Sequence, residues 1–153
     1  MALRKILTID QDEASLRRKS RPVAEFGPRL WELLDDLWDT LHMAQGVGLA
    51  APQVGVLRRV VIIEFEDMVY ELVNPVIVET QGRQEINEGC LSVPGLCGDT
   101  VRPAITRVHA QDRHGNPIEV VGEGILSVAL NHEVEHMDGV LYVDKVIGKL
   151  QEV

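Results

Sequence analysis

The sequence predicts an α+β fold in a single domain that covers residues 1–153. Two stretches have the hydrophobic spacing of helices, and several short runs of β-branched and aromatic residues have the pattern of strands. The strands do not alternate regularly with the helices, as they would in a parallel α/β sheet. The length, the 45% hydrophobic content and the mean hydropathy of +0.01 fit one globular domain with a sizeable core.

The clearest helix is predicted over residues 28–44. Its large apolar residues follow the i, i+3, i+4, i+7 spacing of one buried stripe, and the helix ends where a glycine-containing segment begins. We interpret this helix as scaffold. The stripe consists of Leu30, Leu33, Leu34, Leu37, Trp38 and Leu41.

Strands are predicted where apolar runs lie between turn residues. The first two are joined by a short acidic turn, and the last two form a hairpin across the sequence HGN at 114–116. These strands span residues 59–65, 69–73, 76–79, 105–111 and 117–121.

A second helix is predicted from about Glu123, followed by a last strand near residues 140–146. This helix contains HEVEH at 132–136, which is the most informative motif in the chain. Residues four apart on a helix share a face, so the imidazoles of His132 and His136 can bind one metal ion. Glu133 lies beside them, where it can act on a metal-activated water.

Two alternatives to metal binding are that the HEVEH motif occurs by chance, or that its histidines only pack at the edge of the core. The helical context favours a metal, because Ile125, Val128 and Ala129 lie on the same stripe as the two histidines. Gly139 stands where such a helix would stop.

A catalytic zinc-type site usually has three protein ligands and one open position, so a third ligand is needed. The longer protease motif HExxHxxGxxH is excluded, because its third histidine is replaced by Tyr142. A downstream carboxylate is disfavoured, because Glu152 lies in a tail that we expect to fray. The third ligand is therefore expected upstream.

The upstream candidates include carboxylates and five other residues, which are Cys90, Cys97, His42, His109 and His114. His109 and His114 are predicted to be surface residues of the hairpin, and His42 lies at the end of the first helix. Cys90 follows a glycine in a segment without helical pattern, and a thiolate there would suit iron or zinc. Spacing favours Cys90 over Cys97 only modestly.

Composition narrows the classes of partner. The net charge of −9 and the pI near 5.0 argue against general nucleic-acid binding, including DNA binding. The basic cluster at residues 17–21 is interpreted as a solvated loop. No apolar run approaches the ~18 residues of a membrane span, and the charged start does not resemble a signal peptide. We therefore expect a cytoplasmic protein with free thiols, although an organelle is not excluded.

Three separated segments resemble, in order and spacing, the motifs of the peptide deformylases. They are GVGLAAPQ at 46–53, EGCLS at 88–92 and HEVEH at 132–136. The likeness extends over nearly the whole chain, including VPG at 93–95, Arg102 and GVL at 139–141. It implies mixed, largely antiparallel sheets packed around a central metal-binding helix.

The resemblance implies a hydrolase of protein biosynthesis. Its substrate would be the N-formylmethionine end of newly made proteins, and its products would be formate and a free amine. Cys90, His132 and His136 would hold one divalent metal ion, and Glu133 would be the general base. The ion would be Fe(II) in the cell, with zinc, nickel or cobalt possible in preparations; the sequence does not distinguish between them.

The resemblance also assigns supporting residues. Gln53 and the backbone N–H of Leu91 would stabilise the oxyanion. Glu88 and Arg102 would pair to hold the cysteine loop. The substrate would be bound by the backbone of Gly46, Val47 and Gly48, which would pair with the peptide, and by Val128 and Ala129, which would help to line the methionine pocket.

Some residues depart from the family pattern. Glu135 replaces the usual aspartate, Asn131 stands where many members have glutamine, and Val128 occupies a position that is often arginine. Glu135 is expected to make a supporting contact away from the metal. A transient ribosome contact is compatible with a nascent-chain substrate, but the long C-terminal helix by which some members dock is not carried over.

Three other interpretations are weighed against the deformylase. A different metal hydrolase, such as a small peptidase, could use the same ligands. A non-catalytic binding domain is disfavoured because every expected ligand and the base are present. A structural zinc site is also disfavoured, because such sites usually have four protein ligands.

Overall fold

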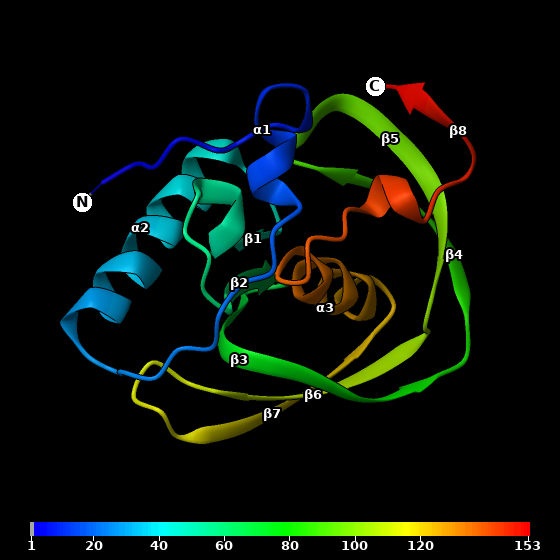
Figure 1. Ribbon diagram of the computed structural model, residues 1–153. Coiled ribbons are helices and arrows are strands. Elements are labelled where there is room, and N and C mark those ends of the chain that lie inside the picture. Colours follow the sequence, from blue (N-terminus) through cyan, green and yellow to red (C-terminus); the bar gives the residue numbers. More distant parts are fainter. Residues whose placement is uncertain (1) are drawn as a thin grey trace.

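The computed structural model describes residues 2–153 and confirms the α+β class (Figure 1). One sheet has five strands in the order β1-β2-β3-β6-β7, and the other has three in the order β4-β5-β8. All paired strands are antiparallel, as the resemblance implies.

The helices are α1 (Ile9–Leu16), α2 (Pro28–Ala44) and α3 (Ile125–His136), with short 3-10 helices η1 (Ala51–Val54) and η2 (Tyr142–Asp144). The strands are β1 (Gly48–Ala50), β2 (Val60–Phe65), β3 (Met68–Gln81), β4 (Gln84–Cys90), β5 (Val93–Arg102), β6 (Ile105–Gln111), β7 (Pro117–Glu123) and β8 (Ile147–Glu152).

Helix α3 lies near the centre of the molecule, and strands of both sheets surround it (Figure 1). Ten of its residues are buried, in agreement with the almost continuous apolar sequence before the histidines. A helix that is apolar on most sides is stable only when it is covered on most sides. The sequence of α3 therefore places the HEVEH motif inside the protein.

The two faces of the five-stranded sheet support different helices. Alternate residues of β2 face opposite sides, so Val61 and Ile63 pack in the core that contains α3, whereas Val60 and Ile62 pack in the core that contains α2. Because both faces are covered, the first four residues of β2 are an unbroken apolar run rather than an alternating one.

Helix α2 matches its predicted range. Pro28 occupies its first turn, and it ends at Gln45, which has a left-handed backbone with φ of 58°. The predicted leucines of its stripe are buried and Trp38 is half-buried. None of the helices in residues 2–153 has both the length and the apolar sequence needed to cross a membrane.

The strands predicted at residues 69–73 and 76–79 are one long strand, β3. Its pairing with β6 shifts register between Val73 and Val76. At the shift, Asn74 has a positive φ of 52°, and its side chain accepts a hydrogen bond from Val23 N–H at 2.7 Å. This irregularity explains the break in the alternating pattern. The sequence analysis did not identify α1, β1, β4 or β5.

The strand predicted near residues 140–146 is wrong. The apolar residues there form the buried turn η2, in which the Leu141 N–H donates to Asp144 Oδ2 at 3.1 Å. The strand follows at β8, which pairs with β5 and brings Glu152 opposite Leu96. The expectation of a frayed tail is therefore also wrong. All side chains of β8 are exposed, so its sequence carries no hydrophobic pattern that would predict it.

We expect Leu130→Ala to lower the free energy of unfolding by about 2–5 kcal/mol, because the substitution leaves a cavity beneath α3. Leu130 is 0% exposed and belongs to the α3 core. Urea denaturation measures the effect. Val121→Ala on β7 is the control, since Val121 is 47% exposed, and an equal loss in both variants would contradict the prediction.

Candidate metal centre and active site

Three potential metal ligands meet in the interior. His132 and His136 come from successive turns of α3, and Cys90 comes from the end of β4. The distance from His136 Nε2 to His132 Nε2 is 3.2 Å, and that from His136 Nε2 to Cys90 Sγ is 3.4 Å. One ligand atom from each residue lies within 4.8 Å of the other two.

These separations fit a tetrahedral metal ion. With metal–nitrogen bonds of about 2.05 Å and a metal–sulfur bond of about 2.3 Å, the edges of a tetrahedron are about 3.4 Å between nitrogens and about 3.5 Å between nitrogen and sulfur. The observed distances of 3.2 and 3.4 Å are close to both values. Three ligands leave one position open, which is the arrangement of a catalytic rather than a structural centre.

The other candidate ligands lie elsewhere. Cys97 is on β5, where its thiol is 4.0 Å from Gln151 Oε1. His42 pairs with Glu64 at the end of α2. His109 and His114 are exposed, on β6 and in the β6–β7 turn, as predicted for surface residues of that hairpin. Of the cysteines, the structure therefore brings only Cys90 to the two histidines.

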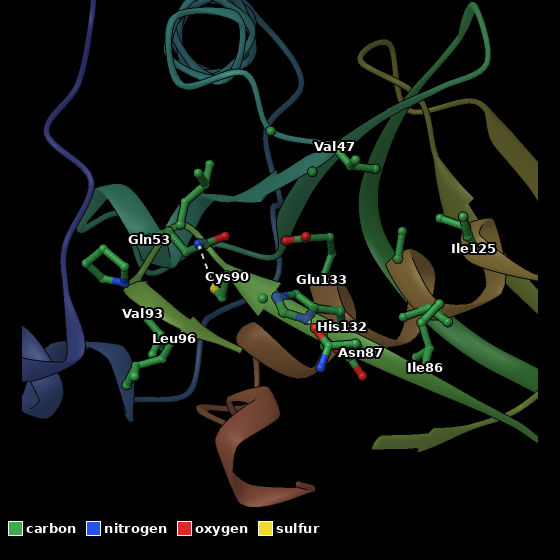
Figure 2. Close-up of a pocket in the computed structure, with 18 of the residues that line it drawn as sticks. Val47, Gln53, Ile86, Asn87, Cys90, Val93, Leu96, Ile125, His132 and Glu133 are labelled. Carbon is green, nitrogen blue, oxygen red and sulfur yellow. Dashed lines mark hydrogen bonds and ion pairs between the residues drawn. The ribbon is translucent and has the colours of Figure 1, made fainter. Parts of the chain in front are cut away.

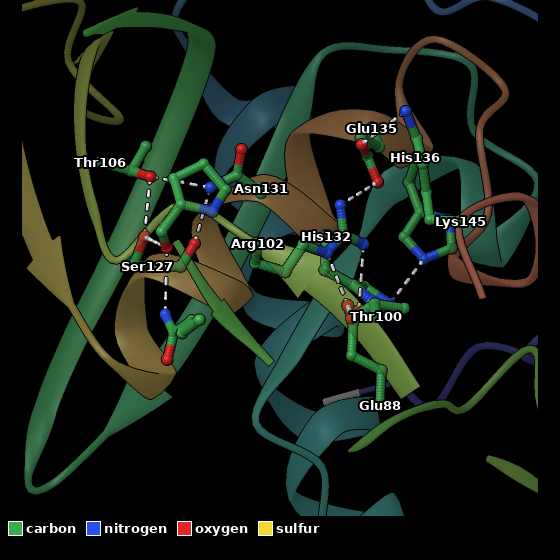
Figure 3. A network of polar contacts seen from close by, with 12 residues as sticks. Glu88, Thr100, Arg102, Thr106, Ser127, Asn131, His132, Glu135, His136 and Lys145 are labelled. Atoms are coloured by element: carbon green, nitrogen blue, oxygen red, sulfur yellow. Dashed lines mark hydrogen bonds and ion pairs between the residues drawn. The ribbon is translucent and has the colours of Figure 1, made fainter. Parts of the chain in front are cut away.

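Glu88 contacts Nδ1 of His132, the ring nitrogen that does not face His136 (Figure 3). His132 Nδ1 lies 2.8 Å from Glu88 Oε1, which leaves Nε2 free for a metal. Arg102 binds both oxygens of the same carboxylate, at 2.5 and 3.1 Å, and the Thr100 hydroxyl also donates to it. Burial acts to raise the pKa of Glu88, but hydrogen bonds from His132, Arg102 and Thr100 lower it to about 2.

This ionic network continues outward from Arg102. Arg102 Nη1 contacts Glu135 Oε1 at 2.9 Å, and Lys145 Nζ lies 3.9 Å from Glu135 Oε2 (Figure 3). Glu135 therefore faces away from the metal ligands, and its contact is with the arginine that binds Glu88. The predicted pairing of Glu88 with Arg102 is present, with both side chains buried.

A second polar cluster fixes α3 against β6 (Figure 3). Asn131 Nδ2 donates to Thr106 Oγ1 and to the Ser127 carbonyl, each at 2.8 Å. The Ser127 hydroxyl lies 2.8 Å from Thr106 Oγ1 and also donates to the Pro103 carbonyl. These buried contacts set the rotation of the helix that carries both histidines.

Glu133 points into the pocket beside the metal ligands (Figure 2). Its side chain is buried, and its Oε1 has no hydrogen-bond partner among residues 2–153. Burial raises the pKa of Glu133 to about 7, against the opposing effect of His132. Such a carboxyl group can both accept and return a proton near neutral pH.

Gly48 makes room for this carboxyl group. A Cβ at position 48 would lie 2.6 Å from Glu133 Oε2 and 2.9 Å from its carboxyl carbon. No side chain larger than hydrogen fits there without moving Glu133. The second glycine of the GVGLAAPQ segment therefore has a steric role, in addition to the substrate contact that the resemblance implies.

Gln53 brings an amide group to the thiol side of the site. Its Oε1 accepts the Ala50 N–H at 2.9 Å, which orients Nε2 toward Ser92 Oγ at 3.1 Å and Cys90 Sγ at 3.5 Å (Figure 2). Leu91, next to Cys90 in the chain, lies on the wall of the same pocket.

Cys90 and His132 lie in the wall of a mainly apolar cavity of about 550 Å³ (Figure 2). All five residues predicted to bind substrate line it: Gly46, Val47, Gly48, Val128 and Ala129. The sequence analysis missed further wall residues: Ile86, Asn87, Gly89, Val93, Pro94, Gly95, Leu96 and Ile125. Ile86 could have been found by strand alternation, since it lies two residues before Glu88 on β4.

Comparison with known proteins gives consistent matches. A family model described as polypeptide deformylase matches residues 3–152. The chain is 50% identical over 152 residues to a peptide deformylase of Caldicellulosiruptor bescii, covering 99% of this chain and 90% of that protein. It is 51% identical over 143 residues to a peptide deformylase of Acetivibrio thermocellus, covering 94% of this chain and 84% of that protein.

Solved structures agree with these sequence matches. The crystal structure of a peptide deformylase from Legionella pneumophila superposes with a TM-score of 0.90 at 44% identity, covering 95% of this chain and 87% of that one. The peptide deformylase of Thermotoga maritima superposes with a TM-score of 0.92 at 29% identity, covering 97% and 100%.

We expect Glu88→Gln to weaken metal binding by about 10- to 100-fold, because a neutral amide is a poorer partner for His132 Nδ1 and leaves Arg102 without its buried counter-ion. Competition with a chromophoric chelator measures the affinity. Glu85→Gln is the control, since Glu85 is exposed on the same strand. Equal affinities for the two variants would refute a role of Glu88 in holding the ligand.

Proposed function

The chain belongs to the polypeptide deformylase family, and from this premise we propose how its residues remove the formyl group from the N-terminal formylmethionine of newly made proteins. The protein is an enzyme, a hydrolase that releases formate and leaves a free amine. The observation that carries the mechanism is Glu133, a buried carboxyl group beside Cys90 and the two histidines, with one oxygen that has no hydrogen-bond partner in the described part of the chain.

The metal would be held by Cys90, His132 and His136, whose separations fit one ion. A divalent cation bound there supplies a Lewis acid that lowers the pKa of a water and polarises the formyl carbonyl. We propose Fe(II) in the cell, with zinc, nickel or cobalt in preparations, because a mixed thiolate and imidazole set accepts all of these ions.

Glu133 would act as the general base and then as the general acid. Its carboxylate takes a proton from the attacking water, and the same proton passes to the amine nitrogen as the bond between carbon and nitrogen breaks. A pKa raised to about 7 by burial suits both transfers, although the positive charge of a cation would act to lower it. Water and formamide are thus converted to formate and amine without another reactant.

Two donors would stabilise the negative charge on the formyl oxygen during attack. Gln53 is oriented by its contact with the Ala50 N–H, so its amide Nε2 needs no reorganisation to donate toward the metal side. We propose the backbone N–H of Leu91 as the second donor. Leu91 directly follows Cys90 in the chain, so its N–H belongs to the peptide bond that joins it to the proposed metal ligand.

The apolar cavity would receive the methionine side chain. Val128 and Ala129 lie on α3 before His132, and they face the cavity from the same helix as the ligands. The backbone of Gly46, Val47 and Gly48 would pair with the extended peptide in the manner of an added strand. The substrate is met where proteins are made, so we propose a bacterial-type cytoplasm and a transient contact with the ribosome.

We expect rapid formate release from a formyl-Met-Ala peptide by protein prepared anaerobically with Fe(II). Glu133→Ala should reduce kcat by about 10²- to 10⁴-fold, because it removes the proton acceptor. An acetylated peptide should remain uncleaved. Formate is measured with a coupled dehydrogenase assay.

The same assay separates the alternatives. Absence of formate release from folded, metal-loaded protein would favour a binding domain. Cleavage of the acetylated or of an internal amide bond at a similar rate would favour another metal hydrolase. Full activity of Glu133→Ala would refute its role as base.

Gly48→Ala should lower kcat/KM at least tenfold with little loss of stability, since the new methyl group displaces Glu133. Steady-state kinetics and thermal unfolding measure the two effects. Gly27→Ala is the matched control, because a Cβ at position 27 has no neighbour within 4 Å. If the two variants have equal kcat/KM, the steric role of Gly48 is wrong.

A further inference from the structure

Tyr142 occupies the position of the third histidine in the longer HExxHxxGxxH motif, and here its ring contacts His132. Its ring stacks on His132, with centroids 6.0 Å apart and an angle of 21° between the planes. The side chain is 1% exposed, and its hydroxyl has no hydrogen-bond partner among residues 2–153. The contact with His132 is therefore made by the aromatic face and not by the hydroxyl.

This contact complements the hydrogen bond of Glu88. The bond at Nδ1 fixes one edge of the His132 ring at 2.8 Å, but it leaves the ring able to tilt about that edge. A flat side chain stacked on the ring opposes such a tilt, because tilting would overlap the two rings on one side and open a void on the other. The two neighbours together determine where Nε2 points.

The turn that carries Tyr142 is anchored at the surface by Arg17. The guanidinium of Arg17 binds both oxygens of Asp144, at 2.5 and 3.1 Å, and donates to the Gly139 carbonyl at 3.2 Å. Asp144 in turn accepts the Leu141 N–H. Arg17 belongs to the basic cluster that we interpreted as a solvated loop, so the structure corrects that interpretation for this residue.

We propose that Tyr142 is a positioning residue for His132, that it acts by stacking on the imidazole, and that the Arg17–Asp144 pair holds it in place. The inference rests on the proposed function only through the assignment of His132 as a metal ligand. It requires the flat ring of Tyr142, and it does not require the hydroxyl.

The test compares Tyr142→Leu with Tyr142→Phe in cobalt-loaded protein. Leucine removes the stacking partner, so we expect the metal to transfer to a chelator about 10- to 100-fold faster and the visible cobalt spectrum to change. Phenylalanine keeps the ring, so both readouts should equal those of the wild type. Neither measurement needs substrate, so failure of the deformylase assignment would not be mistaken for failure of this proposal.

Tyr70→Leu is the matched control for general loss of packing. Tyr70 is half-buried and packs against the α3 core, and it is not stacked on a metal ligand. It should lower stability while leaving the cobalt spectrum and the rate of metal transfer unchanged. Circular dichroism of the metal-free proteins establishes that each variant is folded.

Asp144→Asn supplies a second variant, in case Tyr142→Leu does not fold. It keeps the ring and weakens the anchor, so we expect a smaller but measurable acceleration of metal transfer. The proposal is overturned if folded Tyr142→Leu retains cobalt like the wild type, if Tyr142→Phe behaves like Tyr142→Leu, or if Tyr70→Leu loses cobalt equally fast. When Tyr142→Leu is unfolded, wild-type retention by Asp144→Asn overturns it.

Discussion

The buried carboxylate of Glu88 is the contact on which the rest of the site depends. It joins β4 and β5 to α3, because its oxygens accept from Thr100 and Arg102 on one side and meet His132 on the other. A buried charge is tolerated only when its hydrogen-bonding capacity is filled, and here several donors fill it. The three-stranded sheet is thereby fixed against α3, and Cys90, at the end of the same strand, is brought to the two histidines.

Glu133 is also a buried carboxyl group, but its hydrogen bonding differs from that of Glu88. One of its oxygens has no hydrogen-bond partner among residues 2–153, which is unfavourable for stability, and burial raises the pKa of the group to about 7. Both glutamates interact with His132, but their different surroundings give them different protonation behaviour. Glu88 remains an anion beside His132, whereas the carboxyl group of Glu133 can accept or return a proton near neutral pH. The glycine at position 48 preserves this difference, because it leaves the unpartnered carboxyl group enough space.

The parts of the structure that could be predicted from the sequence are those whose residues lie close together in the chain and follow the regular spacing of one helix. HEVEH required only the helical repeat, and α2 required only its leucine stripe. The choice between Cys90 and Cys97 stayed open because it depends on the pairing of β4 with β5, and neither strand has a strong pattern of its own. The error at residues 140–146 has a related cause, because an apolar run was read as a strand although its burial comes from η2. Stacking of Tyr142 on His132 is a tertiary contact that periodicity does not encode.

The antiparallel β4–β5 pair has a further consequence for how the chain can vary in length. Glu88 and Cys90 share a strand, and successive side chains of a strand point to opposite sides. Gain or loss of a single residue inside β4, between Gln84 and Glu88, would rotate both side chains away from α3 at once, whereas a substitution removes only one contact. Tolerated insertions are therefore expected in the exposed turn at residues 82–83, at the other end of the β4 strand. Length, as well as composition, is constrained along this strand.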